Sequence, residues 1–338
     1  MQTEKKQLLI YVIVAYGITY VQGLLMWYGY GKDLDLSAFP KAQMLYPAAG
    51  VMMAYLITKK EDKNLPKTFY IFFVALTAVL VVCTAASVLA PKNIDLMGTM
   101  FSQWGLILEC IMIGGSVIFW LLLLASGNEK CRVYGLNSGH WNISVLMILL
   151  FIGLYLLRFL IASAFRCRLS EFGKIMANPA TWSMFFTVLM NFFISVVAFF
   201  GEEYGWRYYL QPLLQKKFGL KGGVILLGCV WTVWHLPIDF FYYTTPDMGL
   251  TALASQFVTC ISLGIFMAYT YMKTQNIWVP IIIHFLNNNM VVVFSGTYSA
   301  DVLQNQQIHW GDIPVALVIN LLLFGWVIFL KSFKEKKE

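Results

Sequence analysis

The sequence predicts an all-α fold, a polytopic transmembrane helical bundle of about ten spans with both termini cytoplasmic. Of the 338 residues, 59% are hydrophobic and only 12% are charged, whereas an ordinary soluble domain carries about 25% charged residues. The mean hydropathy is +0.69, and apolar runs of about 20 residues, the length of a transmembrane helix, recur along the chain. This composition excludes a soluble domain, a disordered chain and a disulfide-stapled secreted protein, because too much apolar surface would remain in water.

The spans follow from the apolar runs. A helix made of such a run is long enough, or nearly so, to cross a hydrocarbon core of about 30 Å, and in lipid a helix satisfies its own backbone hydrogen bonds. The alternation of apolar and polar residues that a β-barrel needs is absent. The predicted spans are residues 7–30, 43–58, 69–90, 104–126, 142–165, 182–210, 222–242, 251–272, 276–297 and 313–330.

The basic residues set the predicted orientation. Sixteen of the 24 Lys and Arg residues fall in the termini and in alternate loops, and six fall in the opposite loops. Since Lys and Arg are enriched on the cytoplasmic side, both termini are predicted to be cytoplasmic, which requires an even number of spans. The net charge of +7 therefore marks membrane flanks, and no nucleic-acid partner is expected. Short Lys-rich loops, many Met residues and few Cys residues favour a multi-pass protein of a bacterial plasma membrane, with an uncleaved first span.

Charged and amide side chains inside the spans are the candidates for function. A charge at the bilayer centre costs about 2.5–3.5 kcal/mol even on a lenient insertion scale, so each one needs a physical reason. Most of these residues belong to the sixth, seventh and ninth spans. Glu109 and Arg158 lie in earlier spans, where an ion pair between them would account for both. The candidates are Glu109, Arg158, Glu202, Glu203, Arg207, His235, Asp239, His284, Asn287, Asn288 and Asn289.

The sixth span ends in the segment 199–207, FFGEEYGWR. Glu203 and Arg207 stand four residues apart, so they share one helix face, and an ion pair would offset part of the cost of their burial. Glu202 points about 100° away from that face and is left as a freer carboxylate, which suits a general base. A charge network at the helix end, without catalysis, explains the same residues.

Two histidines lie in the seventh and ninth spans. Trp231 and His235 share one face of the seventh, where Pro237 weakens the helix, and His284 and Asn288 share one face of the ninth. A single histidine on an apolar helix is usually a satisfied core residue. Two such pairs, accompanied by an intramembrane Glu-Glu, favour a polar site instead.

The three motifs in this order resemble those of the CPBP family of intramembrane proteases, which includes the Rce1-like CAAX prenyl endopeptidases and the bacterial Abi-type proteins. The family's Glu-Glu-x-x-x-Arg, aromatic-x-x-x-His and His-x-x-x-Asn motifs match Glu202, Glu203, Arg207, Trp231, His235, His284 and Asn288. Trp231 stands where Phe is usual and keeps an aromatic wall. The resemblance covers about residues 180–297, and the first five spans carry no recognised motif.

The resemblance implies an endopeptidase that hydrolyses peptide bonds without an acyl-enzyme. It implies that Glu202 activates a water molecule and that His235 helps to polarise it. It also implies that His284 and Asn288 stabilise the oxyanion of the tetrahedral intermediate, a task for donors fixed in a water-poor cavity. The remaining matched residues would hold the geometry of the site: Glu203, Arg207 and Trp231.

The need for a metal is open at this stage. The family is also described as metalloproteases, and Glu202, His235 and His284 could form a three-ligand zinc site with an open position. The HExxH signature of zincins is absent, so a metal-free glutamate mechanism without a cofactor is favoured. The six cysteines form no CxxC pair and lie mostly in apolar runs, so buried free thiols are expected rather than disulfides or a cysteine metal site.

The expected partners are the lipid bilayer and a peptide or protein substrate, lipidated or not. The resemblance implies CAAX-type processing in eukaryotic relatives, and in bacteria the maturation of bacteriocins or signal peptides, or self-immunity. Two alternatives stay open. One is a non-catalytic member of the same fold that binds a membrane partner, although the motifs are intact. The other is a proton-coupled transporter, which also places charges at mid-membrane but would show broken helices in matching halves.

The motifs also divide the chain. N-terminal transmembrane helices are expected at residues 1–180, a catalytic helical core at 181–300, and the last transmembrane helix with a basic cytoplasmic tail at 301–338. No soluble domain interrupts this order. The function is therefore expected to reside in the core.

Overall fold

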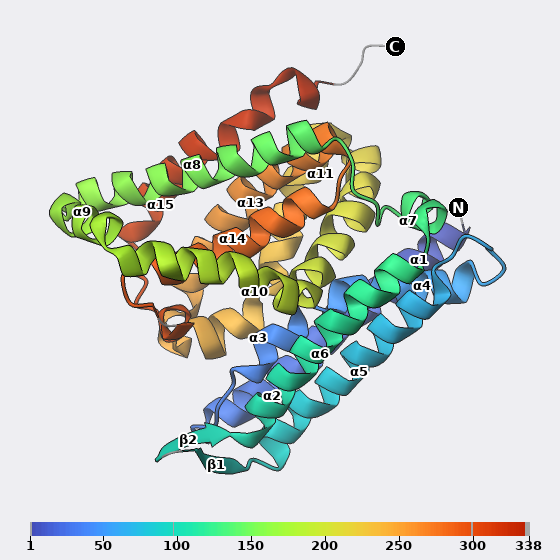
Figure 1. Cartoon of the computed structure of the whole chain (residues 1–338), viewed down its shortest axis with the longest axis horizontal. Coiled ribbons are helices and arrows are strands. Elements are labelled where there is room, and N and C mark those ends of the chain that lie inside the picture. The colour runs from blue at the N-terminus through green and yellow to red at the C-terminus, as the bar shows by residue number, and fades with distance from the viewer. Residues whose placement is uncertain (1, 97, 299, 335–338) are drawn as a thin grey trace. The chain divides into compact units, whose positions relative to one another are not determined.

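The computed structural model describes residues 2–96, 98–298 and 300–334, most of them helical (Figure 1). In this part of the chain, six helical stretches are long and apolar enough to cross a membrane, and two shorter apolar helices span Trp278–Phe294 and Asp312–Leu323. The predicted all-α polytopic helical bundle is confirmed. The chain is a multi-pass membrane protein.

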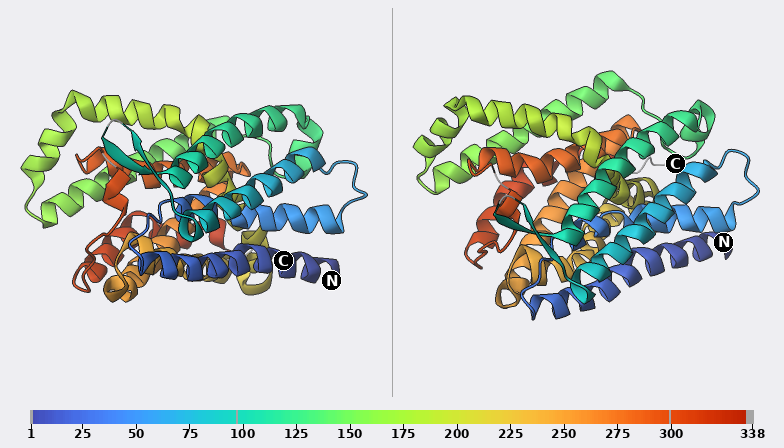
Figure 2. Two further views of the ribbon diagram at one scale, coloured as in Figure 1. Left: turned by 90° about the horizontal axis from the view of Figure 1, so that it is seen from below. Right: turned by 60° about the horizontal axis from the view of Figure 1, so that its bottom comes forward.

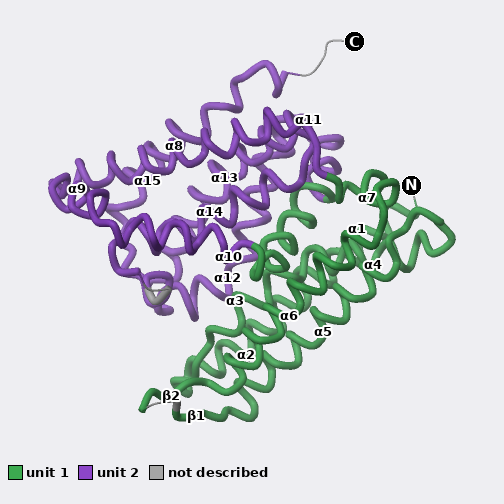
Figure 3. Tube along the Cα trace, in the orientation of Figure 1, with its two compact units in different colours: residues 1–137, 193–209 green, residues 138–192, 210–338 purple. Residues whose placement is uncertain are grey.

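Two compact units divide the chain (Figure 3). Unit 1 comprises residues 1–137 and 193–209, and unit 2 comprises residues 138–192 and 210–338. Helix α10 (Pro179–Glu203) and the π-helical segment η2 (Tyr204–Leu210) carry the chain from unit 2 into unit 1 and back. The division expected at residues 180 and 300 stays a prediction about function.

Unit 1 is built on four helices that pack in sequence. Helix α1 (Gln2–Val12) packs against α4 (Tyr46–Thr58), α4 against α5 (Lys67–Leu89), and α5 against α6 (Gln103–Ala125) (Figures 1 and 2). A small antiparallel hairpin, which the sequence did not predict, pairs Asn93 with Ser102. The further elements are η1 (Ile13–Gly17), α2 (Ile18–Tyr30), α3 (Ala38–Gln43), β1 (Asn93–Leu96), β2 (Thr99–Ser102) and α7 (Asn128–Val133).

Unit 2 is arranged around α13 (Gly249–Thr274), the most deeply buried of the long apolar helices. It packs against α8 (Trp141–Phe165), α11 (Gln211–Trp234), α14 (Trp278–Phe294) and α15 (Asp312–Leu323). The first half of α10 lies on α14, where the rings of Phe192 and Phe285 are 5.2 Å apart. The further elements are α9 (Leu169–Ala177), α12 (Leu236–Ile238), η3 (Asp239–Tyr243), η4 (Pro246–Met248), η5 (Ala300–Leu303), η6 (Gly325–Phe329) and η7 (Lys331–Phe333).

All ten apolar runs are helical over most of their described length. The number of crossings and the cytoplasmic position of both termini stay predictions. The loop expected between the sixth and seventh spans is helical instead, because the chain continues from α10 through η2 into α11. Within α11, the helix is interrupted at Gly219, whose φ of +75° lies in a region that favours glycine.

Large apolar side chains point outward from the long helices. Val82 of α5, Leu124 of α6 and Phe165 of α8 are 66%, 79% and 69% exposed. Only 17% of the apolar window of α8 is buried inside the protein. Lipid tails are as apolar as these side chains, so the bilayer supplies the apolar surroundings that a soluble protein would have to build.

Two glycines let the carboxylate-bearing end of α10 lie against the start of α4. A Cβ on Gly201 would lie 2.7 Å from the Cα of Leu45, and one on Gly205 would lie 2.7 Å from the carbonyl carbon of Pro47. A backbone atom cannot swing aside as the end of a flexible side chain can, so any side chain here collides. The pair Glu202 and Glu203 lies between these two close approaches.

A chain of tyrosine hydroxyls ties the same region to the surface of unit 1. The Tyr70 hydroxyl lies 2.6 Å from that of Tyr204, which donates to the Tyr134 carbonyl at 2.8 Å. The Tyr134 hydroxyl in turn donates to Asp62 at 2.6 Å. This last bond holds the pKa of the Asp62 carboxyl below its usual value. The loop after α4 is therefore anchored to η2 through hydrogen bonds.

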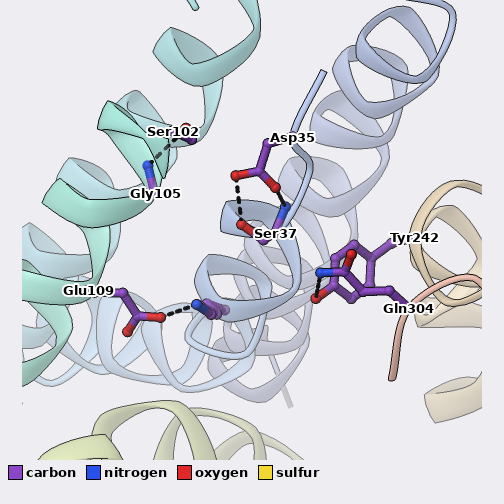
Figure 4. Close-up of polar contacts among 8 residues, drawn as sticks. Asp35, Ser37, Ser102, Gly105, Glu109, Tyr242 and Gln304 are labelled. Carbon is purple, nitrogen blue, oxygen red and sulfur yellow. Dashed lines mark hydrogen bonds and ion pairs between the residues drawn. The ribbon is translucent and has the colours of Figure 1, made fainter. Parts of the chain in front are cut away.

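Glu109 has a different partner from the one suggested by the sequence. It pairs with Lys41 of α3 (Figure 4) and not with Arg158. Both partners belong to unit 1, where α3 packs against α6 and brings the ammonium group to the carboxylate. The expected charge pair between Glu109 and Arg158 is therefore wrong.

The close approach of η2 to α4 predicts that Gly205→Ala lowers the melting temperature of the protein in detergent micelles. Overpacking of a filled site costs about 1–3 kcal/mol. Gly114→Ala is the control, because a Cβ on Gly114 of α6 meets nothing within 4 Å. The control should melt at the wild-type temperature or slightly above it, and equal melting of the two variants would contradict the close approach.

Candidate active site

The carboxylates predicted in the sixth span lie at the end of α10, in unit 1. Glu202, Glu203 and Arg207 are 2%, 0% and 0% exposed. The i,i+4 ion pair expected from the sequence is present, with Glu203 Oε2 3.1 Å from Arg207 Nε. Glu202 instead accepts a hydrogen bond from Trp206 Nε1 at 3.3 Å. The two adjacent carboxylates therefore have different surroundings, one facing a guanidinium and the other an uncharged indole.

The helix changes its winding directly after these carboxylates. Arg207 stands on η2, a π-helix, in which one extra residue enters each turn, and such turns are frequent at functional sites. Another π-helical segment, η3, begins at Asp239, four residues after His235. Nothing in the sequence signalled either segment. The first matched motif therefore ends in backbone that α-helical spacing does not describe, and such backbone follows the second motif.

His235 follows the last residue of α11 in unit 2. Pro237, in the short α12, has no N–H to continue the hydrogen-bond ladder, so the helix is interrupted here. The Nδ1 atom of His235 lies 2.8 Å from the carbonyl oxygen of Trp231. Because a carbonyl oxygen only accepts, Nδ1 carries a proton, and Nε2 of the uncharged ring keeps its lone pair.

His284 and Asn288 lie on one face of α14, as predicted. Asn288 Nδ2 lies 3.3 Å from His284 Nε2, and Asn288 Oδ1 accepts a hydrogen bond from Asn287 Nδ2 at 3.0 Å. The bond from Asn287 holds the Asn288 amide with its NH₂ group toward His284. An NH₂ group has two hydrogens, so one remains for a further acceptor.

One cavity of about 230 Å³ in unit 2 brings these residues together. Trp231, His235, His284 and Asn288 all line it. The Trp231 ring centroid lies 5.8 Å from that of His235 and 5.4 Å from that of His284, so one indole contacts both imidazoles. Glu202, Glu203 and Arg207 belong to unit 1, and the cooperation of Glu202 with the histidines stays a prediction.

Sequence reasoning missed several polar residues of this cavity. Gln256 lies inside an apolar run, so the search for polar residues within spans could have found it. Gln306 lies in the segment before α15, and only the fold brings it to the histidines. The residues missed are Tyr155, Tyr243, Gln256, Thr259, Cys260 and Gln306.

The structure was tested for the three-ligand zinc site. Among the described residues, no group of three or more His, Cys, Asp or Glu side chains is placed to hold a metal ion. The cavity offers two imidazoles and the Cys260 thiol, but these three side chains are not grouped around one position as the ligands of a catalytic zinc ion are.

Comparison with known families assigns the region that carries these motifs. Residues 182–290 match the family model described as Type II CAAX prenyl endopeptidase Rce1-like. This segment belongs to the Rce1-like CAAX prenyl endopeptidase family. The Rce1-like segment contains every site residue predicted from the sequence, and the family as a whole points to an intramembrane endopeptidase.

A more distant likeness extends beyond the Rce1-like segment. The chain is 26% identical over 183 residues to the CAAX prenyl protease 2 of Methanococcus maripaludis, which is 51% of this chain and 66% of that protein. The match thus spans just under two thirds of the relative's length. No solved structure matches the chain.

The geometry of His235 predicts that its Nδ1 carries the proton at pH 8. Nitrogen NMR spectra of protein with ¹⁵N-labelled histidine in lipid should show an Nδ1-protonated ring whose signals disappear in His235→Gln. The exposed His140 and His309 are the references, each assigned by its own substitution. A His235 ring protonated only at Nε2 would contradict the bond to Trp231.

Proposed function

We propose that the chain is an intramembrane endopeptidase that hydrolyses peptide bonds of membrane-associated peptides or proteins. The observation that carries the proposal is the cavity of unit 2, lined by His235, His284 and Asn288 of the Rce1-like segment. Such a cavity offers a lone pair that accepts a hydrogen bond from water and an N–H that meets the charge developing on a carbonyl oxygen. The proposed location is the plasma membrane of a bacterium.

In the proposed mechanism, Glu202 is the general base. Its carboxylate takes a proton from water as the water oxygen bonds to the carbonyl carbon, and the same proton passes to the nitrogen as the C–N bond breaks. The indole of Trp206 orients the carboxylate through its 3.3 Å hydrogen bond. Arg207 forms an ion pair with Glu203, with Nε 3.1 Å from Oε2. His235 accepts the second hydrogen of the water at Nε2.

The oxyanion of the tetrahedral intermediate is assigned to His284 and Asn288. His284 Nε2 holds one hydrogen of the Asn288 amide at 3.3 Å, which leaves the other for the oxyanion. Asn287 fixes the same amide from its oxygen side at 3.0 Å. Donors that are already oriented cost no reorganisation during the reaction, and removing one donor of this kind typically costs about 10²- to 10³-fold in kcat.

The substrate is proposed at the level of its class. The relative from Methanococcus maripaludis is named a CAAX prenyl protease, which supports a membrane-associated peptide with a lipidated, CAAX-type end. Processing of bacteriocins or signal peptides, or self-immunity, uses unlipidated peptides instead. A panel of both kinds separates these substrates. Binding without cleavage would support a non-catalytic partner protein.

The general-base assignment predicts that Glu202→Gln lowers kcat for peptide cleavage in proteoliposomes by about 10²- to 10⁴-fold. The panel contains prenylated CAAX peptides and leader-type peptides with a fluorescent reporter. Glu109→Gln is the matched control, since Glu109 is half-exposed and pairs with Lys41. It should keep wild-type kcat.

Further measurements with the same peptides distinguish the metal-free endopeptidase from the alternatives. Loss of activity on chelation, restored by zinc, would replace the metal-free mechanism. Cys260→Ala should remain active, because the thiol lines the cavity but takes no part in the proposed chemistry. Equal cleavage by wild type and Glu202→Gln would remove Glu202 from the mechanism. Substrate-dependent proton flux without cleavage would favour the transporter.

The hydrogen bond between the two amides predicts that Asn287→Leu lowers kcat by about 10- to 100-fold with little change in KM, because an orienting partner of a site residue is lost. Asn289→Leu is the control. Asn289 bonds its own helix at Phe285 O, 2.8 Å away, and does not line the cavity. Equal effects of the two substitutions would show that Asn287 acts only on helix stability.

A further inference from the structure

A second and larger cavity adjoins the candidate site within unit 2. It measures about 580 Å³ and shares Arg158, Thr259 and Gln306 with the cavity of the histidines. These three shared residues, called the throat here, line both spaces. A peptide lying in the larger cavity reaches the histidines past the throat.

Arg158 is the charged residue of the throat, and its surroundings are aromatic. Its guanidinium carbon lies 4.4 Å from the ring centroid of Tyr155 and 5.8 Å from that of Phe324. Among the described residues, no carboxylate lies within ion-pair distance of it. Arg166, two turns further along the same helix, pairs with Asp312 at 3.7 Å. The helix therefore has one arginine with a carboxylate partner and one with aromatic partners only.

The other two throat residues are engaged by their own surroundings. Gln306 donates from Nε2 to the Leu303 carbonyl at 3.0 Å and from its backbone N–H to the Tyr243 carbonyl at 2.7 Å. The neighbouring Gln304 bonds the Tyr242 hydroxyl at 2.9 Å, which pins this segment to η3 (Figure 4). Thr259 donates to the Ser255 carbonyl at 3.2 Å. Arg158 is thus the strongest donor that the throat can offer to a ligand.

A guanidinium inside an apolar helix is costly in a bilayer and needs a physical reason. Aromatic rings offset part of this cost, and the Tyr155 hydroxyl also hydrogen-bonds Arg158. A guanidinium has five N–H donors, so N–H groups remain for a further acceptor. Those groups match the two oxygens of a carboxylate, which the planar fork binds with two parallel hydrogen bonds. Arg158 can therefore accept a carboxylate supplied by a bound ligand.

We propose that Arg158 is a specificity-determining residue that binds a carboxylate of the peptide substrate. The inference rests on the proposed endopeptidase function, which makes a peptide the ligand. Arg158 and the two histidines line one cavity of about 230 Å³, so a peptide bound there meets both. The carboxylate then lies within a few residues of the bond that is cut, either at the end of the chain or on an acidic side chain.

The test uses three matched peptides that share the cleaved sequence. One ends in a free carboxylate, the second ends in an amide, and the third ends in an amide but carries a Glu near the cleavage point. The wild-type protein should prefer one of the two acidic peptides over the neutral amide by about 10- to 100-fold in kcat/KM, the usual size of a charge-assisted hydrogen bond. The preferred peptide tells a terminal carboxylate from a side-chain carboxylate.

Arg158→Gln should abolish this preference by slowing cleavage of the acidic peptide, while the neutral amide is cut as before. Arg158→Lys should retain part of the preference, because a charge remains without the planar fork. Arg166→Gln is the matched control, because Arg166 lines the larger cavity and has Asp312 as its partner. It should keep the full preference. An unchanged preference in Arg158→Gln overturns the inference, as does an equal loss in Arg166→Gln.

A binding measurement distinguishes failure of this inference from failure of the proposed endopeptidase function. Fluorescence anisotropy with the same three peptides is measured on Glu202→Gln protein, with and without Arg158→Gln. An acid preference that depends on Arg158 supports the inference even where no peptide is cleaved, a result that would count against the endopeptidase alone. Equal affinity for the acidic and neutral peptides, together with equal cleavage, overturns the inference and leaves the endopeptidase standing.

Discussion

The ion pair between Glu203 and Arg207 is the constraint around which the end of α10 is organised. Both side chains are fully buried, and removing one partner of a buried pair typically costs about 3–5 kcal/mol, because an uncompensated charge remains. The pair joins the last residue of α10 to the π-helical η2. Gly201 and Gly205 allow the same segment to lie on α4. Glu202 is held in position because the ion pair and the close packing on α4 fix the residues on either side of it.

Lipid explains why so much of the fold could be predicted from the sequence. A spanning helix must be apolar and must satisfy its own backbone hydrogen bonds, so the ten predicted helices could be recognised in the sequence as apolar runs. The cost of charge in lipid likewise made Glu202, His235 and His284 conspicuous. The partner of Glu203 was found because it lies four residues away on the same helix.

Partners that are distant in the sequence could not be found in this way. Lys41 reaches Glu109 only because α3 packs on α6, and Gln306 reaches the cavity only because its segment bonds to η3. The π-helical segments depend on tertiary packing rather than on local propensity, and no residue pattern marks them. The spacing of apolar and polar residues therefore predicted the helices and their polar faces. Which residues pair across helices depends on long-range contacts.

The way the chain enters the two units has a consequence for how the protein is made. Residues 193–209 complete unit 1 although the segments before and after them belong to unit 2. Chains fold from the N-terminus as they are synthesised, so unit 1 can be completed once residue 209 has been made, whereas unit 2 must wait for α13, α14 and α15. The matched segment 182–290 contains parts of both units and the whole of neither. The matched segment thus coincides with neither compact unit, and family likeness and compactness divide this chain at different places.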